Sequence, residues 1–408
     1  MPTAKVKNPA SNHDVQLIGV VGFAHGLSHF FQLLLPPLFP WIKAEFALSY
    51  TELGLLMTTI FVISAGGQAA AGFLVDRFGP HISMFGGLAC FTAGAAICAV
   101  ASGYWTLMLG GVLLGLGNAV FHPVDYTILN KCVSANRLGP AYSVHGLLGN
   151  VGWGLAPIFL VGLAAPFGWR YALLAAGVLP VIVIVLWIWS LPLMRNAQAV
   201  PRGVKDPEPD QALAFLREKA IWGCIFFFLL VATALGAFQN FGPSVLMGNH
   251  AFPLETAAYC ITVYMFGSAA GMFAGGWLVM KSDKLEMNIT VALLLTALAA
   301  IMVGLQSSSV PIIFGLIALM GVGTGLSGPS RDMLIRAATP AGATGRSYGV
   351  VYSALDLGLA IGAPIFGALM DWGFSTMVFA GIGLCFLLAA STVLLIAYSP
   401  ATLRTQPL

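Results

Sequence analysis

The chain alternates between long apolar runs and short polar stretches along its whole length. The runs approach or exceed the roughly 20 apolar residues that an α-helix needs to cross a bilayer. They lack the strict alternation of apolar and polar positions that is typical of transmembrane β-strands. We therefore expect an all-α membrane protein with twelve transmembrane helices. The spans are predicted at residues 15–40, 50–74, 82–102, 104–130, 141–166, 170–193, 219–247, 256–280, 288–307, 309–336, 346–370 and 375–398.

The polar stretch at 195–218 is the longest and divides the spans into two groups of six. It is too hydrophilic to cross the membrane and too poor in apolar residues to fold alone, which predicts a cytoplasmic linker. The predicted organisation is a cytoplasmic tail at 1–14, a six-helix bundle at 15–194, the linker, a second six-helix bundle at 219–398 and a cytoplasmic tail at 399–408.

The two halves repeat one another in sequence. The segment GLGNAVFHPVD, which ends at Asp125, aligns with GVGTGLSGPSR, which ends at Arg331. The tetrapeptide Ala-Pro-Ile-Phe occurs at 156–159 and again at 363–366. Such a duplication predicts two pseudo-symmetric bundles related by an axis along the membrane normal. This is a transporter architecture, in which the halves rock around a site near the midplane.

Composition and charge agree with a membrane location. Only 8% of residues are charged and 58% are hydrophobic, so a water-soluble surface is excluded. If the N-terminus is cytoplasmic, all of the 18 Lys and Arg residues except Lys43 and Arg170 lie at or near the cytoplasmic side. We expect both termini in the cytoplasm, in a bacterial-type inner membrane. The net charge of +3 then reflects topology and indicates no nucleic-acid partner.

The segment between spans two and three, GFLVDRFG at 72–79, resembles the loop signature of the major facilitator superfamily. The resemblance implies the fold of that family, with spans one, four, seven and ten around a central cavity. It also implies a conformational gate formed by Gly72, Asp76, Arg77 and Gly79, in which Asp76 caps a neighbouring helix end and holds one access state. The equivalent loop of the second half has Met280 and Lys281 where Asp and Arg would stand.

Further motifs resemble exporters of this superfamily. Span five is rich in glycine, as in its proton-coupled exporters, although small residues also let helices pack closely. Phe121-His122-Pro123, the region of His25, and Gly149-Asn150 are similar to the fosmidomycin-resistance type of exporter. Two departures stand out. His29 lies where that group is expected to have an acidic residue, and the span-four arginine signature is missing.

Polar side chains within spans are costly in lipid and usually face a cavity, so they are the candidate site residues. His25, His29 and Gln32 share one face of their helix. Proton coupling is assigned to Asp125, Asp356, His25, His29 and His122, because a coupling group must gain and lose a proton and histidine does so near neutral pH. The candidate substrate-binding residues are Arg331, Gln32, His145, Asn150, Gln239, Asn240 and Tyr352. Each of these residues has the alternative interpretation of a structural hydrogen-bonding or packing residue.

The repeat places Asp125 and Arg331 at equivalent positions of spans four and ten. We hypothesise an ion pair between them that forms or breaks as the bundles rock. Arg331 is alternatively a ligand for a carboxylate or phosphonate, because its guanidinium group matches such anions in a bidentate manner.

The sequence thus predicts a secondary active transporter of a small organic solute, coupled to protons and working by rocker-switch alternating access. Export by drug/proton antiport is the leading direction, and proton-coupled uptake of an organic anion is the alternative. A membrane enzyme is less favoured, since the chain has no HExxH motif and an enzyme would not explain the repeat. A non-transporting sensor is less favoured because the sequence contains no sizeable soluble domain. No P-loop is present to power transport by ATP. The six cysteines show no metal-ligand spacing. We expect a monomer with no metal and no cofactor.

Overall fold

A computed structural model describes residues 9–134, 137–198, 214–217, 219–282, 284–305, 309–338 and 344–397. Within these ranges every regular element is an α-helix or a short 3-10 helix, and twelve spans are long and apolar enough to cross a membrane. The predicted all-α fold class is confirmed. The N-terminal half comprises α1 (Pro9–Gln32), η1 (Pro36–Leu38), α2 (Phe39–Phe46), α3 (Tyr50–Phe78), α4 (Pro80–Ala99), α5 (Tyr104–Ala119), α6 (Phe121–Cys132), α7 (Leu138–Phe167) and α8 (Trp169–Ser190).

Two short 3-10 helices, η3 (Leu191–Gln198) and η4 (Ala214–Arg217), lie in and beside the predicted linker. The rest of that linker lies outside the described residues, as does the predicted tail at 399–408. Residues 9–14 of the predicted N-terminal tail belong to α1. The C-terminal half comprises α10 (Lys219–His250), α11 (Leu254–Val279), α12 (Leu285–Leu305), α13 (Val310–Ala338), α14 (Thr344–Asp371) and α15 (Thr376–Ala397).

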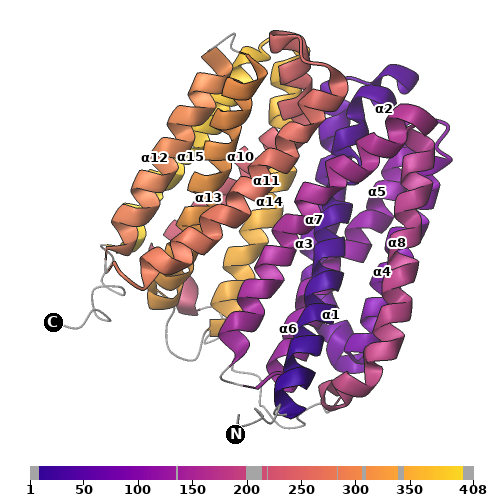
Figure 1. The fold of residues 1–408 in the computed structure, drawn as a ribbon, viewed down its shortest axis with the longest axis vertical. Helices are drawn as coiled ribbons and strands as arrows, with labels where there is room; N and C mark the ends of the chain where they lie inside the picture. Colours follow the sequence, from indigo (N-terminus) through magenta and orange to yellow (C-terminus); the bar gives the residue numbers. More distant parts are fainter. Residues whose placement is uncertain are drawn as a thin grey trace, which may run out of the picture.

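The two halves form two bundles that lie side by side (Figure 1). They meet along two helix pairs, α3 with α14 and α7 with α11. Small residues allow the close approach: a Cβ atom on Gly54 would overlap the Ala363 carbonyl. Hydroxyl groups add hydrogen bonds across the same interface, from Thr58 Oγ1 to the Ala360 carbonyl at 2.7 Å and from Thr262 Oγ1 to the Gly154 carbonyl at 2.8 Å.

The fourth span, predicted as one helix at 104–130, is divided into α5 and α6. Pro123 explains the division, because proline has no amide hydrogen and its ring clashes with the carbonyl four residues earlier. That residue is Ala119, where α5 ends. The new helix α6 then begins at Phe121 and carries His122 and Asp125 in its first turns.

Candidate functional site

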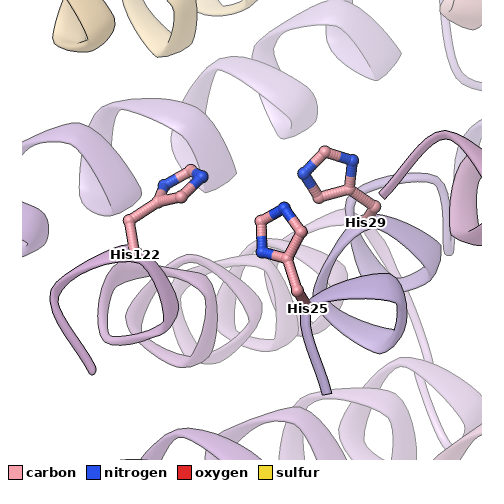
Figure 2. A group of neighbouring side chains, drawn as sticks. All are labelled: His25, His29 and His122. Carbon is pink, nitrogen blue, oxygen red and sulfur yellow. The ribbon is translucent and has the colours of Figure 1, made fainter. Parts of the chain in front are cut away.

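Five of the predicted site residues gather inside the N-terminal bundle, at the junction of α1, α6 and α7. They are His25, His29, His122, Asp125 and His145. The ring centroid of His25 lies 3.5 Å from that of His145, 4.5 Å from that of His29 and 5.2 Å from that of His122. Figure 2 shows the rings of His25, His29 and His122 turned toward one another. We call these five residues the histidine–aspartate cluster.

Asp125 is the one acidic residue of the cluster and lies between two of its imidazoles. Its carboxylate is completely buried, and Oδ2 lies 3.2 Å from His25 Nδ1 and 3.1 Å from His145 Nε2. His145 Nε2 forms a hydrogen bond with this oxygen. In contrast, His25 Nδ1 and Asp125 Oδ1 are buried without a hydrogen bond. A buried carboxylate is costly unless a charge or a proton neutralises it. One carboxylate between two imidazoles is therefore an arrangement suited to holding and moving a proton.

Two glycines of α7 make room for the cluster. A Cβ atom on Gly149 would lie 2.8 Å from His29 Nδ1 and 3.2 Å from His25 Nε2. A Cβ atom on Gly152 would overlap the backbone of Gly26 in α1. Part of the glycine-rich pattern of span five therefore serves close packing around the histidines.

A chain of hydrogen bonds beside the cluster ends on Asp356 of α14. Trp153 Nε1 donates to Gln32 Oε1 at 3.1 Å, and Gln32 Nε2 donates to Asn118 Oδ1 at 3.0 Å. Asn118 Nδ2 donates to Ser64 Oγ at 2.7 Å, which in turn donates to Asp356 Oδ2 at 3.1 Å. Every donor in this chain points toward the buried carboxylate. Asp356 is thus stabilised by side chains of the opposite bundle.

Gln68 of α3 joins Asp356 to the histidine–aspartate cluster. Its Nε2 donates to Asp356 Oδ2, so its Oε1 is the acceptor for His122 Nδ1 at 3.1 Å. His122 then carries its hydrogen on Nδ1. A continuous polar path therefore runs from the N-terminal bundle, through His122 and Gln68, to the C-terminal bundle.

Ser64, Gln68 and Asn118 were not among the sequence-predicted site residues. Ser64 and Gln68 are four residues apart on one face of an apolar span. This spacing could have identified them as candidate site residues. Asn118 is a lone amide between glycine and alanine, and its neighbours in sequence give no indication of a partner 54 residues away.

Other predicted substrate residues lie apart from this hydrogen-bond chain. The Arg331 guanidinium lies over the Phe228 ring at 4.7 Å, and Asn150 Nδ2 donates to Met272 Sδ at 3.0 Å. Gln239 and Asn240 are buried in α10. The side chain of Tyr352 lies outside the described part of the chain. Because Asp125 is paired with histidines here, its ion pair with Arg331 stays a prediction for another access state.

The predicted gate lies where α3 meets α4. Gly79 ends α3 and begins α4 at a φ of +83°, a left-handed conformation that favours glycine. The Arg77 guanidinium lies 5.2 Å over the ring of Phe78, and a Cβ on Gly72 would meet open space. The side chain of Asp76 is outside the described residues, so its capping role stays a prediction.

The opposite end of α3 carries a contact between the bundles that the sequence did not predict. The Asp371 carboxylate, at the last residue of α14, accepts hydrogen bonds from the amides of Tyr50 and Thr51, each at 2.8 Å. Ser49 and Glu52 complete the helix start with a capping box. One bundle thus supplies an additional cap for a helix of the other.

The family model of the major facilitator superfamily matches residues 21–305 and 243–407, so it covers most of the chain. The chain belongs to this superfamily. Membership makes the protein a secondary transporter and not an enzyme. It resembles the crystal structure of a bacterial homologue of the human lysosomal transporter Spinster, inward-facing and unoccupied. That match has a TM-score of 0.76 at 17% identity and covers 95% of this chain and 99% of the other.

Curated relatives are distant. The superfamily member described here is 24% identical to the fosmidomycin resistance protein of Escherichia coli strain K12 over 268 residues, which is 64% of either chain. That match therefore spans less than two thirds of the relative's length. Over 360 residues, 86% of either chain, it is 25% identical to the MFS-type transporter YfnC of Bacillus subtilis strain 168. The membrane sensor protein UhpC of Escherichia coli strain K12 is 24% identical over 267 residues.

Proposed function

We propose that the protein exports a small organic solute in exchange for protons. The observation that carries the proposal is a series of buried polar side chains between Asp125 and Asp356. Asp125 lies between the imidazoles of His25 and His145, and the His25 ring lies 5.2 Å from that of His122. Hydrogen bonds continue from His122 through Gln68 to Asp356 in the other bundle. Buried polar groups of this kind in membrane spans characterise proton relays.

The cluster supplies the groups that a proton-coupled cycle requires. Asp125 and the imidazoles of His25 and His145 are close enough to share one proton. Moving that proton changes the charge on the carboxylate and the hydrogen bonds that each ring can donate. Since His122 and Gln68 extend the path to α14, a change of protonation in one bundle alters the contacts that hold it to the other.

The conformational cycle is a rocking of the two bundles about α3 with α14 and α7 with α11. Closure at the α2 end is held by Asp371 on the start of α3. The opposite end carries Gly72, Asp76, Arg77 and Gly79, which hold the bundles closed there in the other access state. On the positive-inside pattern, this second gate faces the cytoplasm and both termini are cytoplasmic.

Export is favoured by the glycine-rich α7 and by the relative named for fosmidomycin resistance. The test uses the purified protein in proteoliposomes with an imposed pH gradient and a pH-sensitive dye in the lumen. Fosmidomycin and a panel of drug-like cations and anions are offered in turn. We expect at least one solute to move against the direction of proton flow, and Asp125→Asn to abolish that coupling.

Two outcomes would overturn the proposal. Solute and proton moving in the same direction would make the protein a symporter, which is the uptake alternative. Solute flux that is unchanged when the pH gradient is collapsed would exclude proton coupling of either kind.

A further inference from the structure

His29 belongs to the histidine–aspartate cluster but has no part in the polar path. Its Nδ1 is buried without a hydrogen bond, and its ring lies 4.0 Å from that of Trp153 between centroids. A buried imidazole nitrogen without a partner is costly, and such an atom requires an explanation. The nitrogen atoms that could share a ligand with it belong to two more imidazoles, those of His25 and His122.

The three rings bring their donor atoms together. One nitrogen from each of His25, His29 and His122 lies within 4.8 Å of the others. Figure 2 shows each ring with a nitrogen directed at the space between them. Nitrogen ligands of a tetrahedral zinc ion, bound at about 2.0–2.1 Å, stand about 3.4 Å apart. Rotations of the side chains that shorten the separations by up to about 1.4 Å would therefore form a three-histidine site.

One of the rings is oriented by a hydrogen-bonded outer partner, and a second lies close to one without hydrogen-bond geometry. His122 donates from Nδ1 to Gln68, which leaves its Nε2 free to bind a metal. The Nδ1 of His25 faces the Asp125 carboxylate at 3.2 Å, which leaves Nε2 on the side of His29 and Gly149. Metal-binding histidines typically present one nitrogen to the ion and donate the other to a carboxylate or an amide oxygen. Asp125 and Gln68 supply these groups.

We propose that His25, His29 and His122 bind one divalent transition-metal ion, of the class of Zn²⁺, Co²⁺ or Ni²⁺. Three neutral imidazoles suit this class, whereas Mg²⁺ and Ca²⁺ prefer oxygen ligands. The ligands come from α1 and from the first turn of α6, which follows the break that Pro123 makes. The ion's fourth position is left open to water or to a ligand group of the solute.

Metal binding would compete with protons, because a nitrogen bound to a metal cannot hold a proton. An ion in the site would then block the exchange of protons along the path through His122. This consequence rests on the proposed proton coupling. The binding of the ion does not, so the two ideas can fail separately.

The test is a titration of the full-length protein in lipid nanodiscs with Co²⁺, after removal of any polyhistidine tag. Co²⁺ held by three imidazoles gives visible absorption bands that the aqueous ion lacks. We expect one Co²⁺ per protein, displaced by Zn²⁺. His29→Gln and His122→Gln should each lower the affinity by on the order of 100-fold, and Gln68→Ala by about tenfold as an outer partner.

Two further histidine variants sharpen the test. His250→Gln, in the C-terminal bundle, is the matched control and should leave the titration unchanged. His145→Gln distinguishes our site from the second group of neighbouring donor atoms in the cluster, which consists of His25, Asp125 and His145. In our assignment it retains binding of one ion with the same absorption bands. Helical circular dichroism and monodisperse elution identify variants that fail to fold, and Gln68→Ala provides a milder variant of the same site.

The proposal is overturned if the wild-type protein binds no Co²⁺, or if His29→Gln leaves the affinity unchanged. It is also overturned if His145→Gln removes binding as fully as His29→Gln, since the ion would then lie at the other group. If Co²⁺ binds as expected but Zn²⁺ leaves the pH-gradient-driven flux intact, the site stands and its link to proton coupling fails.

Discussion

The hydroxyl of Thr51 donates a 2.6 Å hydrogen bond to the carboxylate of Asp371, a residue 320 positions later in the chain. The same carboxylate accepts from the Thr51 amide, so Asp371 holds the start of α3 by both backbone and side chain. In the rocking cycle proposed above, these bonds exist only while the bundles are closed at this end. They would then stabilise one access state and not the other.

Replacing Asp371 with alanine should therefore shift the protein toward the state that is open at the α2 end. Loss of a helix cap costs about 1 kcal/mol, which is roughly a fivefold change in the ratio of the two states. The readout is labelling by a membrane-impermeant maleimide of Thr58→Cys, at the bundle interface, in a cysteine-free background. Glu45→Ala is the control, because Glu45 accepts its hydrogen bonds from Trp169 and Arg170 within one bundle. Equal labelling of the two variants would contradict the role of Asp371.

Asp125→Asn should separate coupling from binding of the solute. An amide cannot take up the proton that, in the proposed cycle, the carboxylate shares with His25 and His145. Net export driven by a pH gradient should fall on the order of 100-fold, the scale of a lost proton-transfer group, and its dependence on pH should flatten. Exchange of labelled for unlabelled solute should persist, because it needs no net proton movement.

The matched control for that variant is Asp14→Asn. Asp14 is also a buried carboxylate of the N-terminal bundle, but its nearest basic groups are His13 and Arg137 at 3.7 and 3.9 Å. It should retain gradient-driven export. Loss of both net export and exchange in Asp125→Asn would assign Asp125 to binding or folding and not to coupling.

Gly149→Ala should destabilise the protein, whereas Gly146→Ala should stabilise it. Alanine favours helix over glycine by about 1 kcal/mol at either position. At Gly149 the added methyl group meets the rings of His29 and His25, and overpacking costs about 1–3 kcal/mol. At Gly146 it meets only Met272 Cε, at an ordinary 3.6 Å. In detergent, the thermal unfolding temperature of Gly146→Ala should be higher than that of Gly149→Ala. The reverse order would contradict the crowding at Gly149.

Gln68→Leu should destabilise the protein, and a second change should reverse part of the loss. The leucine removes a donor from the buried Asp356 carboxylate, at a cost of about 1–3 kcal/mol. Asp356→Asn in the same chain removes the charge that needed the donor. A double-mutant cycle on unfolding should therefore give a coupling energy of about 0.5–3 kcal/mol. Additive effects would show that the two side chains do not depend on each other.

Much of the fold was predictable from the sequence, because apolar runs of membrane length identify spans wherever they occur. The division of the fourth span was not predicted, although Pro123 was visible. One proline barely changes the hydropathy of a span, so the hydropathy pattern does not reveal the break. The helix is nevertheless interrupted, because the ring of Pro123 clashes with the carbonyl of Ala119. That division places His122 and Asp125 at the start of a new helix.

The candidate site was predictable as a set of residues but not as an arrangement. His25 and His29 share a helix face, which spacing reveals, but their meeting with His122 and His145 depends on how three helices cross. Spacing in sequence reveals metal ligands that share one helix, but it does not reveal donors that separate helices bring together. The proposed pair of Asp125 and Arg331 came from equivalent positions in the repeat. Equivalence relates two positions by symmetry, and histidines of its own bundle are nearer partners for Asp125 in this state.

Asp356 receives its hydrogen bonds from Ser64 and Gln68, two residues of a helix that belongs to the other bundle. Any movement that draws α3 away from α14 at this level leaves a carboxylate without these donors in the interior of the membrane. Water or a proton must then replace them. In the proposed cycle, rocking of the bundles is thus a chemical step as well as a mechanical one, and its rate should depend on how readily the interface is hydrated.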